Sequence, residues 1–200
     1  MSDPKVKLFN ILRESMLDLQ PQNNSIILTE PNNHGKPGTL EKIRITGIPD
    51  GALVIKPEHA SIAVVKGENS SYNGHNISKY RRHCDYVIIS ELAGKGVVFY
   101  IEMKSTSRSR DHIQQLWCGR CLMEYINFLI KNLDGIRPAF DLYEHRYVKF
   151  CSIPEDKDTT ILDISFKQNK RPFPSNILPS QTFVCNVDND ECVELKDLIV

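Results

Sequence analysis

The pattern of apolar and polar positions divides the chain into segments of different character. Near the start, apolar residues recur at three- and four-residue spacing between Pro4 and Pro21, which predicts an amphipathic helix over residues 4–19. The pattern then changes to short apolar runs between Pro, Gly and Asn. These runs predict strands at SIILTE, KIRITGI, ALVIK and SIAVV, and the polar stretch GENSSYNGHN predicts a solvent-exposed loop.

The next segment carries the strongest strand pattern. CDYVIIS and GVVFYIEMK are rich in β-branched and aromatic residues, and ELAGKG between them supplies Gly94 and Gly96 for a turn, so we expect a β-hairpin. Apolar positions from Ile113 to Leu133 return to helical spacing and predict a helix that covers the hairpin and ends near residues 134–135. Further strands are expected at YVKFCSI, TILDISF and TFVCNV.

This order of elements predicts the fold class. Helix, strands, hairpin, helix and strands together indicate an α/β or α+β domain with a mixed central sheet flanked by helices. A length of 200 residues fits a single domain spanning the whole chain. The apolar runs are far shorter than the roughly 20 residues of a membrane span, and the start lacks a signal sequence, so we expect a cytoplasmic protein without membrane contact. The six scattered cysteines are expected to be reduced thiols.

Charge narrows the possible binding modes. The formal net charge is zero, so nucleic-acid binding cannot be argued from an overall basic surplus and needs local patches or a partner. Basic residues flank one part of the chain, and acidic residues gather near its end. The basic group is Lys79, Arg81, Arg82, Lys104, Arg108 and Arg110; the acidic group is Asp188, Asp190, Glu191, Glu194 and Asp197.

The hairpin carries the candidate chemistry. Alternate side chains of a strand share a face, so Glu102 and Lys104 project together, opposite to Phe99, Ile101 and Met103. Counted from Lys95, Asp85 is ten residues back and Glu102 seven forward, so an asymmetric turn or a small offset brings their carboxylates together. Two such ligands, with the Met103 backbone carbonyl, can hold Mg²⁺. Lys104 can orient or help deprotonate a water molecule.

Asp85 is followed, after sixteen residues, by Glu102-Met103-Lys104, which lies on an apolar strand before a helix. This arrangement resembles the PD-(D/E)XK nuclease superfamily. The resemblance covers roughly residues 80–133, with Cys84 where the family name has proline. It implies a restriction-endonuclease-like core and a nuclease that hydrolyses DNA with Mg²⁺ or Mn²⁺. By family analogy the chain is a homodimer or a subunit of a larger complex that acts in restriction, repair or antiviral defence.

The resemblance also points to additional residues. Glu14 on the first helix matches a position where many members carry a further metal ligand, although a surface glutamate is the common alternative. Gln114 or Gln115 matches a polar residue that helps position water or phosphate. Separately from the family, four arginines, Arg81, Arg82, Arg108 and Arg110, can line the path of a nucleic-acid backbone or serve only as soluble loop residues.

Structural interpretations compete with these functional ones. An acidic-x-Lys triplet on a strand also occurs as an ion pair on a solvated face. Cys118 and Cys121 form a CxxC inside a predicted helix and are expected to be core or boundary thiols. His83 is expected to face solvent at the strand end. Trp117 and Tyr125 are expected to pack in the core rather than to stack on bases.

Two other functions remain open. Zero net charge and the acidic segment also fit a non-catalytic module that binds nucleic acid or a protein. An RNase with the same residues is the third possibility, although no aromatic RNA-binding strand motif is visible.

Overall fold

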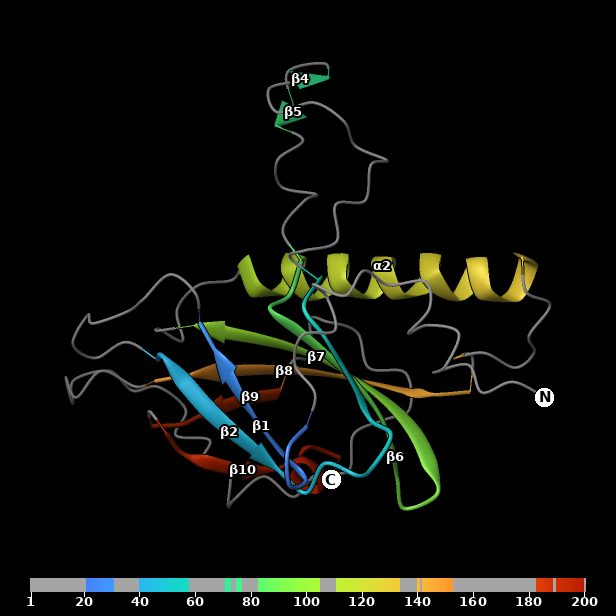
Figure 1. Ribbon diagram of the computed structural model, residues 1–200. Helices are drawn as coiled ribbons and strands as arrows, with labels where there is room; N and C mark the ends of the chain where they lie inside the picture. The colour runs from blue at the N-terminus through green and yellow to red at the C-terminus, as the bar shows by residue number, and fades with distance from the viewer. Residues whose placement is uncertain are drawn as a thin grey trace.

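The computed structural model describes residues 21–30, 40–57, 71–72, 75–76, 83–104, 111–133, 140, 142–152, 183–188 and 190–199. They form three layers: a helix, a five-stranded sheet and a three-stranded sheet (Figure 1). The expected mixed class of α and β elements is confirmed. The predicted helix over 4–19 and the strands SIAVV and TILDISF lie outside the described residues. No helix in the described ranges combines the length and hydropathy that a membrane span requires.

The five-stranded sheet contains the predicted hairpin. Its strands, in spatial order, are β3 (Leu53–Ile55), β6 (Tyr86–Leu92), β7 (Lys95–Lys104), β8 (Glu144–Cys151) and β9 (Phe183–Asn186). β6 is antiparallel to both of its neighbours, β3 and β7, whereas β7, β8 and β9 run parallel to one another. Parallel neighbours need a long crossover, and helix α2 (Asp111–Leu133) lies within the connection between β7 and β8. The predicted hairpin, its following helix and the strands at ALVIK, YVKFCSI and TFVCNV are confirmed.

The three-stranded sheet joins distant parts of the chain. β2 (Lys42–Thr46) lies between β1 (Ser25–Thr29), which is antiparallel to it, and β10 (Cys192–Glu194), which is parallel. A short 3-10 helix, η5 (Leu195–Leu198), follows β10. β1 and β2 confirm the predicted strands SIILTE and KIRITGI. β10 and η5 were not predicted, because the acidic residues around them obscure a short apolar alternation.

One predicted loop contains strand structure. Within GENSSYNGHN, β4 (Ser71–Tyr72) and β5 (His75–Asn76) pair antiparallel as a separate two-stranded sheet. The prediction of a loop throughout this stretch is therefore wrong. The intervening sequence is Asn-Gly, the dipeptide that most favours a two-residue hairpin turn.

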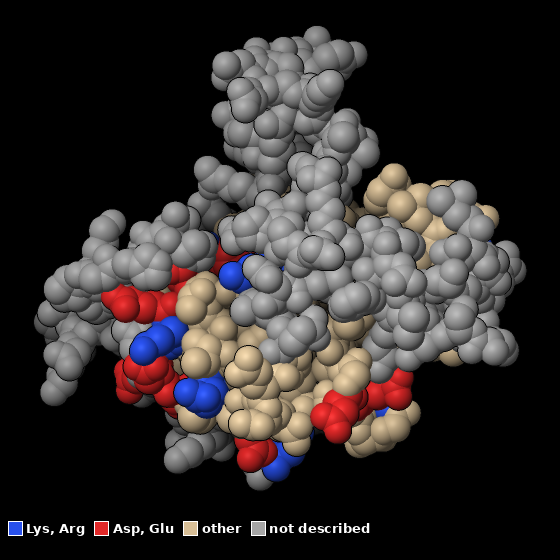
Figure 2. Space-filling model, in the orientation of Figure 1, with Lys and Arg blue, Asp and Glu red and all other residues tan. Residues whose placement is uncertain are grey.

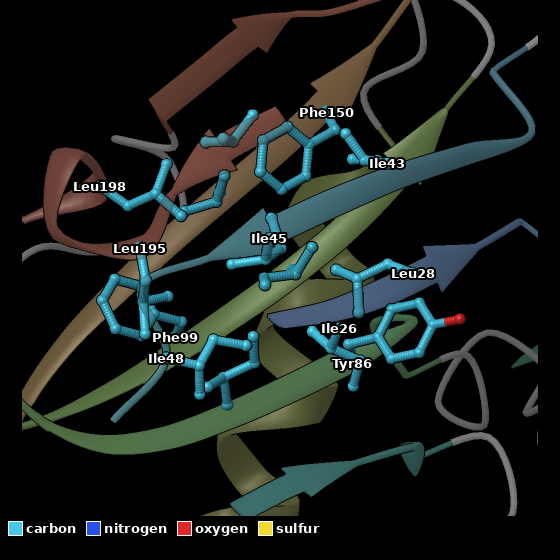
Figure 3. Packing of buried hydrophobic residues seen from close by; sticks show 14 of the residues in the cluster. Ile26, Leu28, Ile43, Ile45, Ile48, Tyr86, Phe99, Phe150, Leu195 and Leu198 are labelled. Carbon is cyan, nitrogen blue, oxygen red and sulfur yellow. The ribbon is translucent and has the colours of Figure 1, made fainter. Parts of the chain in front are cut away.

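The two sheets pack face to face through an apolar core (Figure 3). Residues from β1, β2, β6, β7, β8 and η5 meet there, among them Leu28, Ile43, Ile45, Ile88, Phe99, Phe150 and Leu195. Among the described residues, a second sheet rather than a helix therefore covers this face of the central sheet. The alternating burial of β1 and β2 supplies the apolar sheet face that packs here. Of the helices expected to flank the central sheet, α2 is described, and the helix over 4–19 lies outside the described residues.

The opposite face of the five-stranded sheet is covered by α2. Buried side chains of α2, Leu116, Leu122, Met123, Ile126 and Ile130, pack on Val87, Ile89, Val98 and Tyr100 of the hairpin. Trp117 and Tyr125, however, are 40% and 45% exposed, so the prediction that they pack in the core is wrong. The helix buries only one stripe, and these two positions lie next to the stripe rather than within it.

Candidate active site

The hairpin turn sets the register of the site. Ala93 and Gly94 both have positive φ, 51° and 77°, as a two-residue type I′ turn requires. Pairing runs without interruption from Leu92 opposite Lys95 to Tyr86 opposite Ile101. The hairpin is thus centred between residues 93 and 94 rather than on Lys95, and Gly96 belongs to β7. Continued by one residue beyond Tyr86 and Ile101, the same register brings Asp85 opposite Glu102 without an asymmetric turn or an offset.

A hydrogen bond holds Asp85 at the end of β7. Its Oδ2 accepts the backbone N–H of Met103, with 2.6 Å between the two heavy atoms. Asp85 directly precedes β6, and this contact ties its carboxylate to the neighbouring strand. N–H and C=O groups of one strand residue point toward the same neighbour, so the Met103 carbonyl is directed to the side where Asp85 lies.

Glu102 and Lys104 share the sheet face that α2 covers. Val98 and Tyr100, which precede them at alternate positions of β7, pack under α2, whereas Met103 belongs to the core between the sheets. Glu102 is fully buried and forms an ion pair with Lys104, whose side chain is 25% exposed. The expected projection of Glu102 and Lys104 away from Phe99, Ile101 and Met103 is confirmed.

The electrostatics of Glu102 and Lys104 follow from burial and from each other. The pKa of Glu102 is raised to about 8: burial is the largest cause, the Asp85 carboxylate acts in the same direction, and Lys104 opposes both. Burial acts to lower the pKa of Lys104, but the carboxylates of Glu102 and Asp85 outweigh it and raise that pKa above its ordinary value. Lys104 therefore remains a cation at neutral pH.

Two further charged residues at this site were missed by sequence reasoning. Glu30, directly after β1, is buried, and its charge raises the pKa of both Glu102 and Lys104. Lys149 of β8 is fully buried and stands in register with Glu102. Burial lowers the pKa of Lys149. Each is a charged residue in or just after an apolar run, SIILTE or YVKFC, and that signal could have identified them.

The donor atoms at the site suit a hard cation. Mg²⁺ binds through one or two protein carboxylates and keeps several waters, which matches Asp85 and Glu102. The buried Oε2 of Glu102 has no hydrogen-bond partner among the described residues, and a bound cation would satisfy it. Within the same ranges, no group of three or more His, Cys, Asp or Glu side chains is arranged to hold a metal. The two carboxylates therefore fit a metal that draws its remaining ligands from backbone, water and substrate.

Of the other predicted site residues, two glutamines are described by the structure and the remaining ones are not. Gln114 and Gln115 lie partly exposed in the first turns of α2. Glu14 and the four arginines, Arg81, Arg82, Arg108 and Arg110, lie outside the described residues.

His83 does not face solvent. It is partly buried, its Nδ1 atom is inaccessible, and the backbone of Cys118 on α2 accepts a hydrogen bond from the ring. Burial lowers its pKa. The prediction of a solvent-facing histidine is wrong because α2 packs across the start of β6.

All six cysteines are free thiols. Cys118 is partly exposed and Cys121 is exposed on α2, so both are boundary rather than core residues. The thiols add no ligand set to the site.

Acidic and basic side chains adjoin one another on the face shown in Figure 2. Lys42 pairs with Asp190 at 2.9 Å, and Lys196 pairs with Glu194. Two of the acidic residues near the end of the chain are thus locally neutralised.

Comparisons with known proteins give no match to a family model, to a curated protein or to a solved structure.

Proposed function

We propose that the chain is a metal-dependent nuclease of the PD-(D/E)XK type that hydrolyses phosphodiester bonds of DNA. The observation that carries the proposal is the hairpin register, which brings Asp85 opposite Glu102 when it is continued by one residue beyond its last pair. Asp85 also accepts the Met103 N–H, and Lys104 forms an ion pair with Glu102. The order of an antiparallel hairpin, a helix and a strand parallel to the hairpin's second strand agrees with a restriction-endonuclease-like core.

Each residue of the site has a distinct role in this proposal. Asp85 and Glu102 hold Mg²⁺ or Mn²⁺, with the Met103 carbonyl as a further ligand. The cation supplies charge neutralisation at the phosphate and lowers the pKa of bound water. Lys104 remains protonated, so it orients the attacking water and stabilises negative charge on the phosphate rather than acting as the base.

The surface charges bear on how substrate is held. Acidic and basic groups are intermixed on the face in Figure 2, which supports dimerisation or a partner protein as the means of retaining DNA. Local basic residues add sequence-independent affinity through phosphate contacts.

Cleavage of plasmid DNA by the purified chain, with Mg²⁺ or Mn²⁺, tests the proposal. We expect Lys104→Ala to lower the cleavage rate by ~10²-fold or more while Mn²⁺ binding persists, because a charge that acts mainly on the transition state is removed. Asp85→Asn should lose both cleavage and Mn²⁺ binding. The matched control Lys95→Ala removes an exposed lysine at the opposite end of β7 and should cleave normally.

The same assay separates the alternatives. Unchanged cleavage after Lys104→Ala and Asp85→Asn would refute the assignment of the site. Faster cleavage of RNA than of DNA, measured side by side, would make the chain an RNase. Cleavage of neither substrate, alone or in a reconstituted complex, would favour a non-catalytic binding module.

A further inference from the structure

A second candidate site lies under α2, on the same sheet face as Glu102 but farther toward the start of β7. It is a cavity of about 300 Å³ between α2 and strands β7 and β8. Val98, Met123 and Phe140 form apolar walls, while Arg120, Glu124 and His145 supply polar groups. A volume of ~300 Å³ is at the lower end of small-molecule sites. The cavity thus has room for a small ligand and offers it both apolar and polar contacts.

Arg120 is a fixed cation at the edge of the cavity. Its Nε donates to Oε1 of Glu124 at 2.7 Å, and its Nη1 donates to the Tyr147 hydroxyl at 2.8 Å. In the described part of the chain, its Nη2 has no hydrogen-bond partner. Burial opposes the charge of Arg120, but the two hydrogen bonds outweigh burial and raise its pKa. The guanidinium is therefore oriented in advance, with one nitrogen available to a ligand.

Glu124 is a weak competitor for that cation. Its side chain is 57% exposed, and exposed ion pairs contribute only ~0–1 kcal/mol. Glu124 can turn into water at little cost, which opens a second edge of the guanidinium to a ligand. The bond from Arg120 to Tyr147 keeps the guanidinium in place when this happens.

His145 adds a neutral donor on the cavity wall. The hydroxyl of the buried Tyr100 lies 3.0 Å from Nδ1 of His145, and the two rings stack with centroids 5.8 Å apart. With the hydroxyl as donor, the histidine proton is on Nε2. Burial lowers the pKa of His145 to about 4, so the ring carries no charge at neutral pH.

We propose that this cavity binds a small organic anion, in which a carboxylate or phosphate monoester contacts Arg120 and a flat apolar body packs against Val98, Met123 and Phe140. The guanidinium fork matches the oxygen spacing of both anionic groups. The site uses none of the proposed nuclease residues. Tyr100 precedes Glu102 by two positions, roughly 7 Å along the strand, so the two sites adjoin without sharing a ligand.

Calorimetric titration of the full chain tests the proposal with benzoate, phenyl phosphate, adenosine monophosphate, inorganic phosphate and benzamide. Benzamide has the shape of benzoate without its charge. We expect benzoate or phenyl phosphate to bind at least ~10-fold more tightly than benzamide and than inorganic phosphate, because both the anion and the apolar body contribute. Preference between benzoate and the two phosphate esters identifies the anionic group.

Matched variants locate the binding. Arg120→Ala should weaken binding of the best probe by ~10-fold or more. Arg44→Ala removes an exposed arginine from β2 in the other sheet and should change nothing. Glu124→Gln should tighten binding several-fold, since it removes the competing carboxylate and leaves the bond to Tyr147. Lys104→Ala should bind the probe normally, which separates this site from the proposed nuclease site.

Three results would overturn the proposal: no probe binding at millimolar concentration, an affinity for benzamide equal to that of the best anionic probe, or equal loss from Arg120→Ala and Arg44→Ala. Circular dichroism shows whether Arg120→Ala remains folded. If it does not, Glu124→Gln decides, because unchanged or weaker binding by that variant contradicts competition for Arg120.

Discussion

Glu102 is a carboxyl group that the fold removes completely from water while placing it beside both a carboxylate and an ammonium group. Burial dominates, so its pKa rises to about 8 despite the ion pair with Lys104. A buried charge of this kind is expensive unless a partner satisfies it. Under the proposed function, the bound cation would be that partner for Glu102.

Stability of the metal-free protein should depend on this group. The ordinary pKa of 4.5 applies to the unfolded chain and about 8 to the folded one, so between these values the native state binds more protons. The free energy of unfolding should therefore fall as pH rises from about 5 to about 8. Glu102→Gln should remove this contribution and be ~1–3 kcal/mol more stable than the parent at pH 8.

Urea denaturation in the presence of a chelator, repeated across this pH range, measures the effect. Glu91→Gln changes an exposed glutamate on β6 and should keep the parent's pH dependence. An identical slope for Glu102→Gln and the parent would show that Glu102 is ionised in the folded protein throughout.

At the scale of elements, one glycine sets how closely α2 approaches the hairpin. A Cβ at Gly119 would lie 2.4 Å from the Sγ of Cys84, far inside van der Waals contact. Cys84 directly precedes Asp85, so this contact places α2 over the start of the site. Glycine is ~1 kcal/mol less favourable than alanine within a helix, but here it allows α2 to approach Cys84 closely.

Gly119→Ala should therefore lower the free energy of unfolding by ~1–3 kcal/mol despite its better helix propensity. Cys84→Ala removes the clashing sulfur and leaves the new methyl 3.6 Å from the Cβ of residue 84, an ordinary contact. In that background the same glycine substitution should be neutral or stabilising. A double-mutant cycle by thermal denaturation measures the coupling, and additive effects of the two changes would rule out the contact.

At the scale of the whole molecule, one tyrosine joins the two sheets at their edge. The Tyr86 hydroxyl donates to the backbone carbonyl of Thr29 at 2.8 Å and accepts the Thr29 N–H at 2.9 Å. Tyr86 begins β6, beside Asp85, whereas Thr29 ends β1, beside Glu30. A single side chain thus aligns the strand ends that carry two of the acidic residues.

Tyr86→Phe should lower the free energy of unfolding by ~1–3 kcal/mol, because it leaves two backbone groups without their partner. It should also weaken Mn²⁺ binding, since the strand ends at the proposed site lose their alignment. Tyr143→Phe is the control, because its hydroxyl contacts Glu91 at 3.4 Å in an exposed position and its loss should change stability by less than ~0.5 kcal/mol. Equal effects of the two substitutions would argue against a special role for Tyr86.

Elements with local signals could be predicted from the amino-acid sequence. Alternating β-branched and aromatic residues with a Gly-bearing turn predicted the hairpin, and helical spacing predicted α2. The sequence also predicted that Asp85, Glu102 and Lys104 come together, because residues at equal distances from a hairpin turn lie opposite each other. The predicted turn was centred on Lys95, which is wrong, because alanine rarely occupies a turn position with positive φ and Ala93 was therefore not recognised as one.

Features that depend on contacts between distant segments could not be predicted from the sequence and follow from how the elements pack. Glu30 reaches the site from the second sheet, Lys149 from the strand after α2, and the cavity at Arg120 exists only where the helix crosses the strands. The side of α2 that is buried, and hence the exposure of Trp117, also depends on that crossing. Periodicity in a sequence specifies that a face is apolar, but packing geometry determines which surface it meets and which polar groups are enclosed with it.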